Sequence, residues 1–170
     1  MGIGEFHDIT FLIDFGLTKQ YHHQESHIHI SMQECSAFVG TPAFASVNGH
    51  FKHKLSHWED LESLAYSLMF LHCGSLSWLE QGRNYPSRSF IQWMKESIKL
   101  DHSGNIPGEI ISVLTYACSL SFTQKPDYNH LWALLLPAVS FTLPTRAIAA
   151  MAVSQPTYVK ADIHESQPSV

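Results

Sequence analysis

The carboxylate best placed for chemistry is Asp14, which ends a short apolar run and begins the tripeptide Asp-Phe-Gly. The run 9–13 is rich in β-branched and aromatic residues, so it predicts a strand, paired in a hairpin with the residues around Ile3. A carboxylate can ligate magnesium, but one carboxylate seldom holds that ion without phosphate oxygens that share it. A metal role for Asp14 therefore requires a phosphate-bearing ligand.

Two other groups of side chains could carry chemistry. Histidines are concentrated in one loop, at His22, His23, His27 and His29. Zinc sites are usually completed from a second ordered element, and no CxxC or HExxH motif is nearby. This favours a solvated loop, with a metal site as the alternative. Cys35 could act as a nucleophile with these histidines, but no oxyanion donors or orienting third group accompany it.

Composition indicates one domain. The chain has 170 residues, 45% hydrophobic and 15% charged, which is enough to build a core. The formal net charge of -5 argues against a nucleic-acid-binding protein, which normally carries a basic face. The most apolar region, 131–153, is interrupted by Pro137, Pro144 and Arg146, so we expect no membrane span.

The cysteines and the N-terminal residues indicate the compartment. Cys35, Cys73 and Cys118 form an odd set without CxxC spacing, which favours reduced thiols. The first residues show no basic start followed by an apolar run, as a signal peptide would. We therefore expect a cytoplasmic or nuclear protein.

Helical patterns dominate after residue 55. Ser56 and Glu59 have the spacing of a capping box, and Gly74 supplies a stop, so a buried central helix is predicted between them. Its inward residues are expected to be Leu61, Leu64, Ala65, Leu68 and His72. Three further helices are predicted at 89–100, 107–119 and 126–136, and 19–49 is expected to be a loop. After Pro137 the pattern dissolves, so 137–170 is expected to be a divergent, poorly ordered tail.

Four segments, in order, resemble the C-terminal lobe of casein kinase I-type protein kinases over residues 1–136. The first is the run into Asp-Phe-Gly at 11–17. Residues 40–48 read Gly-Thr-Pro-Ala-Phe-Ala-Ser-Val-Asn, close to the family's Gly-Thr-Ala-Arg-Tyr-Ala-Ser-Ile-Asn. Residues 59–78 contain Glu-Asp-Leu-Glu-Ser-Leu and end in Gly-Ser-Leu-Ser-Trp, and residues 125–128 read Lys-Pro-Asp-Tyr. Together the segments identify a serine/threonine protein kinase-like chain.

The resemblance implies a fold and a set of site residues. The fold would be mainly α, a kinase-like C-terminal helical lobe with a short β-hairpin at its start and without the N-terminal lobe. Asp14 would ligate the magnesium that bridges the phosphates of ATP, and Ile13 would line the nucleotide side of the cleft. Phe15 and Gly16 would have structural roles. Asp60 would brace the catalytic loop from below, or act as an ordinary acid in the first turn of a helix.

The catalytic loop of the family is not found. That loop has Asp, then Lys two positions later and Asn five positions later, and no aspartate of this chain fits. No strand lysine precedes Asp14, and Met1 matches a position just after the loop. Basic residues that the family uses for acidic substrates are also replaced, at His22, Gln33, Ser36, Ala43, Cys118 and Ser121.

Two functions remain open. The chain is a fragment of an ATP-dependent kinase that phosphorylates protein Ser/Thr, or it is a pseudokinase-like module that binds proteins. In both cases we expect these 170 residues alone to be inactive and not to bind ATP and Mg²⁺, because several transfer components are absent together. Protein substrates or partners are expected, with self-association through exposed apolar surface.

Overall fold

The computed structural model describes residues 4–7, 9, 11–35, 37–79, 86–98 and 106–140. Within these ranges the chain is mainly helical, as predicted. The α-helices are α1 (Val47–His50), α2 (His57–Cys73), α3 (Arg88–Ile98), α4 (Gly108–Ser119) and α5 (Tyr128–Ser140). Two short 3-10 helices, η1 (Gly4–Phe6) and η2 (Phe15–Leu17), precede them. The described part contains no strand, only isolated antiparallel bridges between His22 and His29 and between Glu34 and His53.

Helix α2 begins and ends where its capping residues predict. The Ser56 backbone N–H donates to the Glu59 carboxylate at 2.7 Å, which is one half of a capping box. At the other end Gly74 adopts φ 74°, and its N–H donates to the Phe70 carbonyl at 2.8 Å. A left-handed backbone at that position suits glycine.

The buried face of α2 differs from the face that the leucine spacing predicts. Leu64 is 46% exposed and His72 is also exposed, whereas Glu59 and Glu62 are fully buried. The buried residues of the helix are Trp58, Glu59, Glu62, Ala65, Tyr66 and Met69. The prediction that Leu64 and His72 point inward is therefore wrong. The reason is that the Val47 N–H and the Asn48 amide, both outside the helix, donate to Glu62 and Glu59, which no local pattern reveals.

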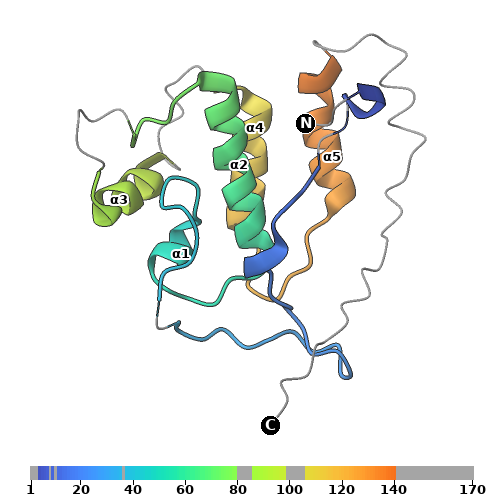
Figure 1. Ribbon diagram of the computed structural model, residues 1–170, viewed down its shortest axis with the longest axis vertical. Coiled ribbons are helices and arrows are strands. Elements are labelled where there is room, and N and C mark those ends of the chain that lie inside the picture. The colour runs from blue at the N-terminus through green and yellow to red at the C-terminus, as the bar shows by residue number, and fades with distance from the viewer. Residues whose placement is uncertain are drawn as a thin grey trace.

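The helices pack around one core. Helix α2 packs against α4, α4 against α5, and α1 against α3 (Figure 1). Trp78, which follows α2, lies fully buried with its ring edge-on to Tyr66 at 5.2 Å. The core cluster comprises Ala65, Tyr66, Met69, Leu76, Trp78, Ile91, Ile110, Val113, Leu114 and Leu131.

The remaining helices agree with the predicted segments, with two differences. Helix α5 continues past the expected end at residue 136 to Ser140, with Pro137 inside it. Proline removes one backbone hydrogen bond, which is why the sequence pattern placed the end of the helix before it. Helix α1 lies within the predicted loop; Ser46 caps it by accepting the Gly49 N–H at 3.1 Å. A helix of four residues is too short for periodicity to detect. The expected tail stays a prediction, because 141–170 lies outside the described residues.

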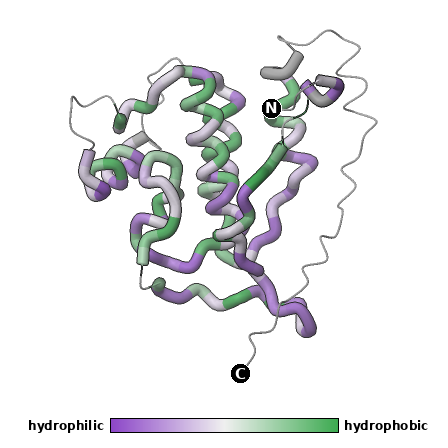
Figure 2. Tube along the Cα trace, in the orientation of Figure 1, coloured by the Kyte–Doolittle hydropathy of each residue, from purple (hydrophilic) through white to green (hydrophobic). Residues whose placement is uncertain are grey.

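The predicted N-terminal hairpin is not confirmed. Residues 11–14 have no regular secondary structure, and Ile3 lies outside the described residues. The segment is apolar and crosses between α2 and α5 (Figures 1 and 2). Its side chains are nevertheless open to solvent, with Leu12 81% and Ile13 77% exposed.

None of the described helices is long and apolar enough to cross a bilayer.

The observed buried face of α2 can be tested with one substitution on that face and one on the exposed face. We expect Met69→Ala to lower the free energy of unfolding by about 2–5 kcal/mol, because Met69 is 1% exposed. Leu71→Ala should change it by less than about 0.5 kcal/mol, because Leu71 is 77% exposed. Urea denaturation of both variants measures the difference. Equal effects would contradict the observed orientation of the helix.

Candidate functional site

Asp14 lies at a strained turn that opens the 3-10 helix η2. Its backbone has φ 63° and ψ 72°, in the left-handed region that few residues other than glycine adopt. The turn is stabilised by the Asp14 carboxylate, which accepts the Gly16 N–H at 3.3 Å. A Cβ on Gly16 would lie 3.2 Å from the same carboxylate oxygen, so glycine suits this position. The tripeptide Asp-Phe-Gly thus forms a compact acidic turn.

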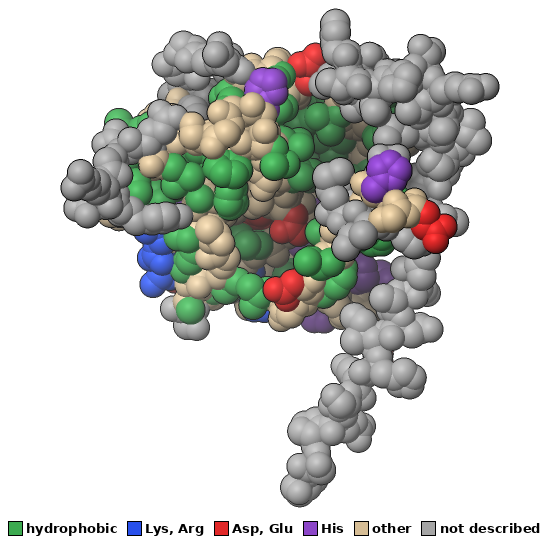
Figure 3. Space-filling view, turned by 45° about the horizontal axis from the view of Figure 1, so that its top comes forward, with side chains coloured by type: hydrophobic (Ala, Val, Ile, Leu, Met, Phe, Trp, Pro, Cys, Tyr) green, Lys and Arg blue, Asp and Glu red, His purple; other side chains and the backbone are tan. Residues whose placement is uncertain are grey.

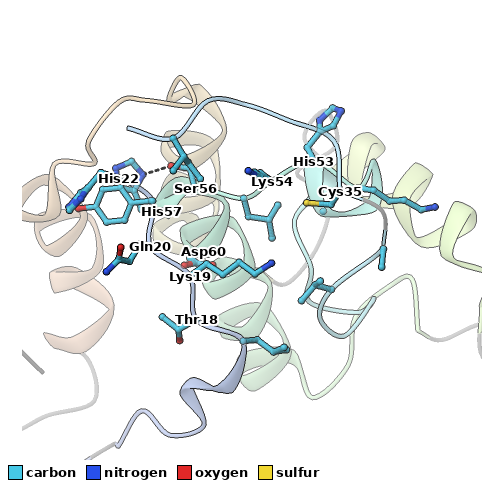
Figure 4. Close-up of a pocket in the computed structure, with 18 of the residues that line it drawn as sticks. Thr18, Lys19, Gln20, His22, Cys35, His53, Lys54, Ser56, His57 and Asp60 are labelled. Atoms are coloured by element: carbon cyan, nitrogen blue, oxygen red, sulfur yellow. Dashed lines mark hydrogen bonds between the residues drawn. The ribbon is translucent and has the colours of Figure 1, made fainter. Parts of the chain in front are cut away.

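A cavity of about 710 Å³ brings Asp14 and Asp60 to one site. They are contributed by the turn before η2 and by the first turn of α2. Figure 4 shows Asp60 beside Lys19, below Ser56 and His57. The cavity wall does not include Ile13 or Phe15, which are 77% and 62% exposed. The structure therefore brings together two of the predicted site residues, Asp14 and Asp60, while Ile13 and Phe15 lie outside the cavity.

The Asp60 carboxylate faces the cavity. It forms no hydrogen bond or ion pair within the part of the chain that the structure describes. The surrounding protein removes part of its water, and this desolvation raises the pKa of Asp60. A group that donates hydrogen bonds would stabilise its charged form.

These acids do not fit a magnesium site by themselves. Magnesium requires near-octahedral oxygen coordination, usually from one or two carboxylates together with phosphates and water. Among the described residues, no group of three or more His, Cys, Asp or Glu side chains could hold a metal ion. The predicted role of Asp14 toward Mg²⁺ and ATP therefore stays a prediction.

The histidine loop packs on the start of α2. The His29 Nε2 atom lies 2.8 Å from the Ser56 hydroxyl, which lies 2.9 Å from His57 Nδ1. The Tyr21 ring lies tilted against the His57 ring, with 4.7 Å between the ring centroids. Burial, His29 and Lys125 together lower the pKa of His57, with burial the largest cause. His29 is thus a packing residue of the site.

Behind the cavity, a buried lysine holds residues 40–48. The Lys95 side chain is fully buried, and its Nζ atom donates to the Pro42 carbonyl at 2.8 Å and the Ala45 carbonyl at 2.6 Å. The same atom lies 4.7 Å from the Tyr66 ring centroid and 5.3 Å from that of Trp78. Burial lowers the pKa of Lys95 to about 7, and the Glu62 carboxylate opposes that shift. Lys95 thereby ties the segment to α3.

Side chains near α2 hold the rest of that segment. The Glu62 carboxylate accepts the Val47 N–H at 3.1 Å and the Tyr66 hydroxyl at 2.7 Å. The Asn48 amide donates to Glu59 at 3.3 Å, and the Trp78 indole N–H donates to the Ala43 carbonyl at 3.0 Å. These hydrogen bonds join residues 40–48 to α2 and to the residues that follow it.

Sequence reasoning missed Lys95. Ile91 and Met94 were expected to lie on the inner face of this helix, and Lys95 lies four positions after Ile91, on that face. A charged residue on an apolar face was the available signal. What it binds could not be read, because its partners lie about fifty residues earlier in the chain.

A comparison with protein-family models finds no match to this chain.

Removing the Lys95 amine should loosen residues 40–48. Lys95→Met keeps much of the apolar stem but leaves two buried carbonyls without their donor, which costs about 1–3 kcal/mol for each. We expect a loss of unfolding free energy of that order, measured by urea denaturation. Lys125→Met, at an exposed lysine, is the control and should change little. Similar losses in both variants would contradict the role of Lys95 in holding residues 40–48.

Burial of Glu59 should make stability depend on pH. Burial raises the pKa of Glu59 from 4.5 to about 7, so the folded state holds a proton that the unfolded state loses. The contribution of Glu59 is therefore fully present below pH 4.5 and decreases as the pH rises to about 7. His50 acts in the opposite sense, because burial lowers its pKa from 6.5 to about 4.

The Glu59→Gln variant separates the pH dependence of stability that Glu59 causes from the part that His50 causes. We expect the unfolding free energy of the unmodified chain, relative to that of Glu59→Gln, to decrease from pH 4.5 to pH 7 by an amount on the order of a few kcal/mol. Denaturant titrations at several pH values measure this difference. A difference that stays constant with pH would show that Glu59 does not titrate in this way.

Proposed function

We propose that this chain forms the C-terminal lobe of a casein kinase I-like serine/threonine kinase. The family transfers the γ-phosphoryl group of ATP to protein hydroxyls. In that role Asp14 would ligate the nucleotide-bound magnesium, and Asp60 would accept backbone N–H groups of the catalytic loop.

The observation that carries the proposal is the buried network around residues 40–48. Two of the four segments that resemble the family contribute to it: residues 40–48, and residues 59–78 through Glu62 of α2 and Trp78 at the helix exit. A third segment, 125–128, has a defined structural role of its own, because Asp127 caps α5 by accepting the N–H groups of Asn129 and His130, each at 3.0 Å. Residues that resemble the family at separate places in the sequence thus depend on one another in space.

These 170 residues by themselves would not transfer a phosphoryl group. No aspartate among them is followed by lysine and asparagine at the required spacing, and the described acids do not hold magnesium unaided. Loss of such components lowers transfer rates by orders of magnitude.

A second candidate is a non-catalytic module that binds proteins, including a second copy of this chain. Exposed apolar side chains favour it: Leu12, Ile13 and Leu17 are each at least 70% exposed on one segment. Figure 3 shows apolar side chains over much of one face, with few charged ones among them. Large exposed apolar patches usually mark interaction sites.

A graft tests the kinase proposal. Residues 1–136 would replace the corresponding part of an active casein kinase I, and phosphorylation of casein would be measured with magnesium and ATP. We expect activity that Asp14→Asn lowers by at least about a hundredfold, because the metal loses its carboxylate. Glu25→Gln, at an exposed loop acid, should leave activity unchanged.

One result would contradict the proposed kinase role, and another would contradict the expected inactivity of the chain alone. A folded graft without activity would leave the protein-binding module as the better reading. Casein phosphorylation by the purified 170-residue chain that Asp14→Asn abolishes would show that the chain alone is catalytic.

A further inference from the structure

Two lysine side chains extend into the cavity that Asp14 and Asp60 line. Lys19 follows η2, and Lys54 lies just before α2. Figure 4 shows the Lys19 side chain extending from beside Asp60 toward the side of the site that carries Cys35, with Lys54 above it. The cavity volume, about 710 Å³, lies within the range of small-molecule sites.

Much of the cavity wall is aliphatic. The apolar lining residues are Leu17, Ile30, Ala37, Val39 and Leu55. Covering apolar wall with an apolar ligand is favourable by about 25 cal/mol for each Å² removed from water. The wall therefore favours a ligand with an apolar body.

The charges at the cavity favour an anion. Lys19 and Lys54 form no ion pair within the described residues, and Lys52 also lines the cavity. Three of the ten Lys and Arg residues of a chain with net charge -5 therefore meet at one cavity. They outnumber the two lining carboxylates, Asp14 and Asp60. Lys54 is half-buried, whereas Lys19 and Lys52 are exposed at the rim, so the attraction for an acidic group is least screened at Lys54.

We propose that this cavity binds a small organic anion with an apolar body. Lys19 and Lys54 hold its acidic group, and the aliphatic wall covers its body. Asp60, whose carboxylate accepts no hydrogen bond from the described residues, is positioned for a donor on the ligand. The site requires neither magnesium nor a nucleotide, but it shares Asp60 with the contact proposed for the catalytic loop.

Three probes separate charge from apolar contact. Octanoate, octylammonium and inorganic phosphate would each be titrated into the full 170-residue chain by isothermal titration calorimetry. We expect binding of octanoate and at least tenfold weaker binding of the other two. Octylammonium carries the wrong charge, and phosphate lacks the apolar body.

Variants at Lys54 locate the site. Lys54→Met should weaken octanoate binding roughly tenfold or more, because a charge-assisted hydrogen bond is lost. Lys54→Arg, which keeps the charge, should retain binding within about threefold. Lys125→Met is the control outside the cavity and should bind as the unmodified chain does. Circular dichroism establishes that each variant is folded.

Several results would overturn the proposal. Absence of octanoate binding to the folded chain is one, and equal binding of octylammonium is another. Equal binding of phosphate would show that the apolar wall has no part. Unchanged octanoate affinity in both Lys54→Met and Lys19→Met would place the ligand elsewhere.

Discussion

The structure depends on the hydrogen bonds that the buried Lys95 amine donates to the carbonyls of Pro42 and Ala45. Residues 40–46 form no helix or strand, so their position must come from side chains on other elements. Lys95 on α3 holds Pro42 and Ala45, while Glu62 on α2 accepts the N–H of Val47, the first residue of α1. Because this segment leads directly into α1 and then to the cavity wall at Lys54, the geometry of the cavity follows from these buried contacts.

Local chemistry made part of the fold predictable. The capping pair Ser56 and Glu59 and the stop at Gly74 fix α2 through contacts within a few residues, so the sequence alone located this helix. The sequence did not predict correctly which face of α2 is buried. Leucine spacing suggested one side, but the partners of Glu59 and Glu62 come from Asn48 and Val47, outside the helix. Tertiary partners thus outweighed local hydrophobicity, and they did so again at Lys95.

The residues of the candidate site were also predictable only in part from the sequence. Asp14 and Asp60 were identified through family resemblance, and the structure places both at one cavity although 46 positions separate them. Ile13 was expected beside a nucleotide, but it is solvent-exposed and does not line that cavity. Lys54 was not singled out at all, because it stands in an irregular stretch whose direction no periodicity defines. Loop residues approach one another only through the fold, so their convergence was not accessible from spacing.

Shifted pKa values explain how the core accommodates the buried side chains of Glu59 and Lys95. Burial shifts the pKa of Glu59 upward and that of Lys95 downward, in both cases to about 7. Near neutral pH neither group need carry its full charge, which reduces the cost of removing it from water. Neutralisation does not abolish the contacts of Lys95, because an uncharged amine still has two N–H groups for the carbonyls of Pro42 and Ala45. The position of residues 40–48 therefore depends on hydrogen-bond donors more than on charge, and replacing the amine differs physically from titrating it.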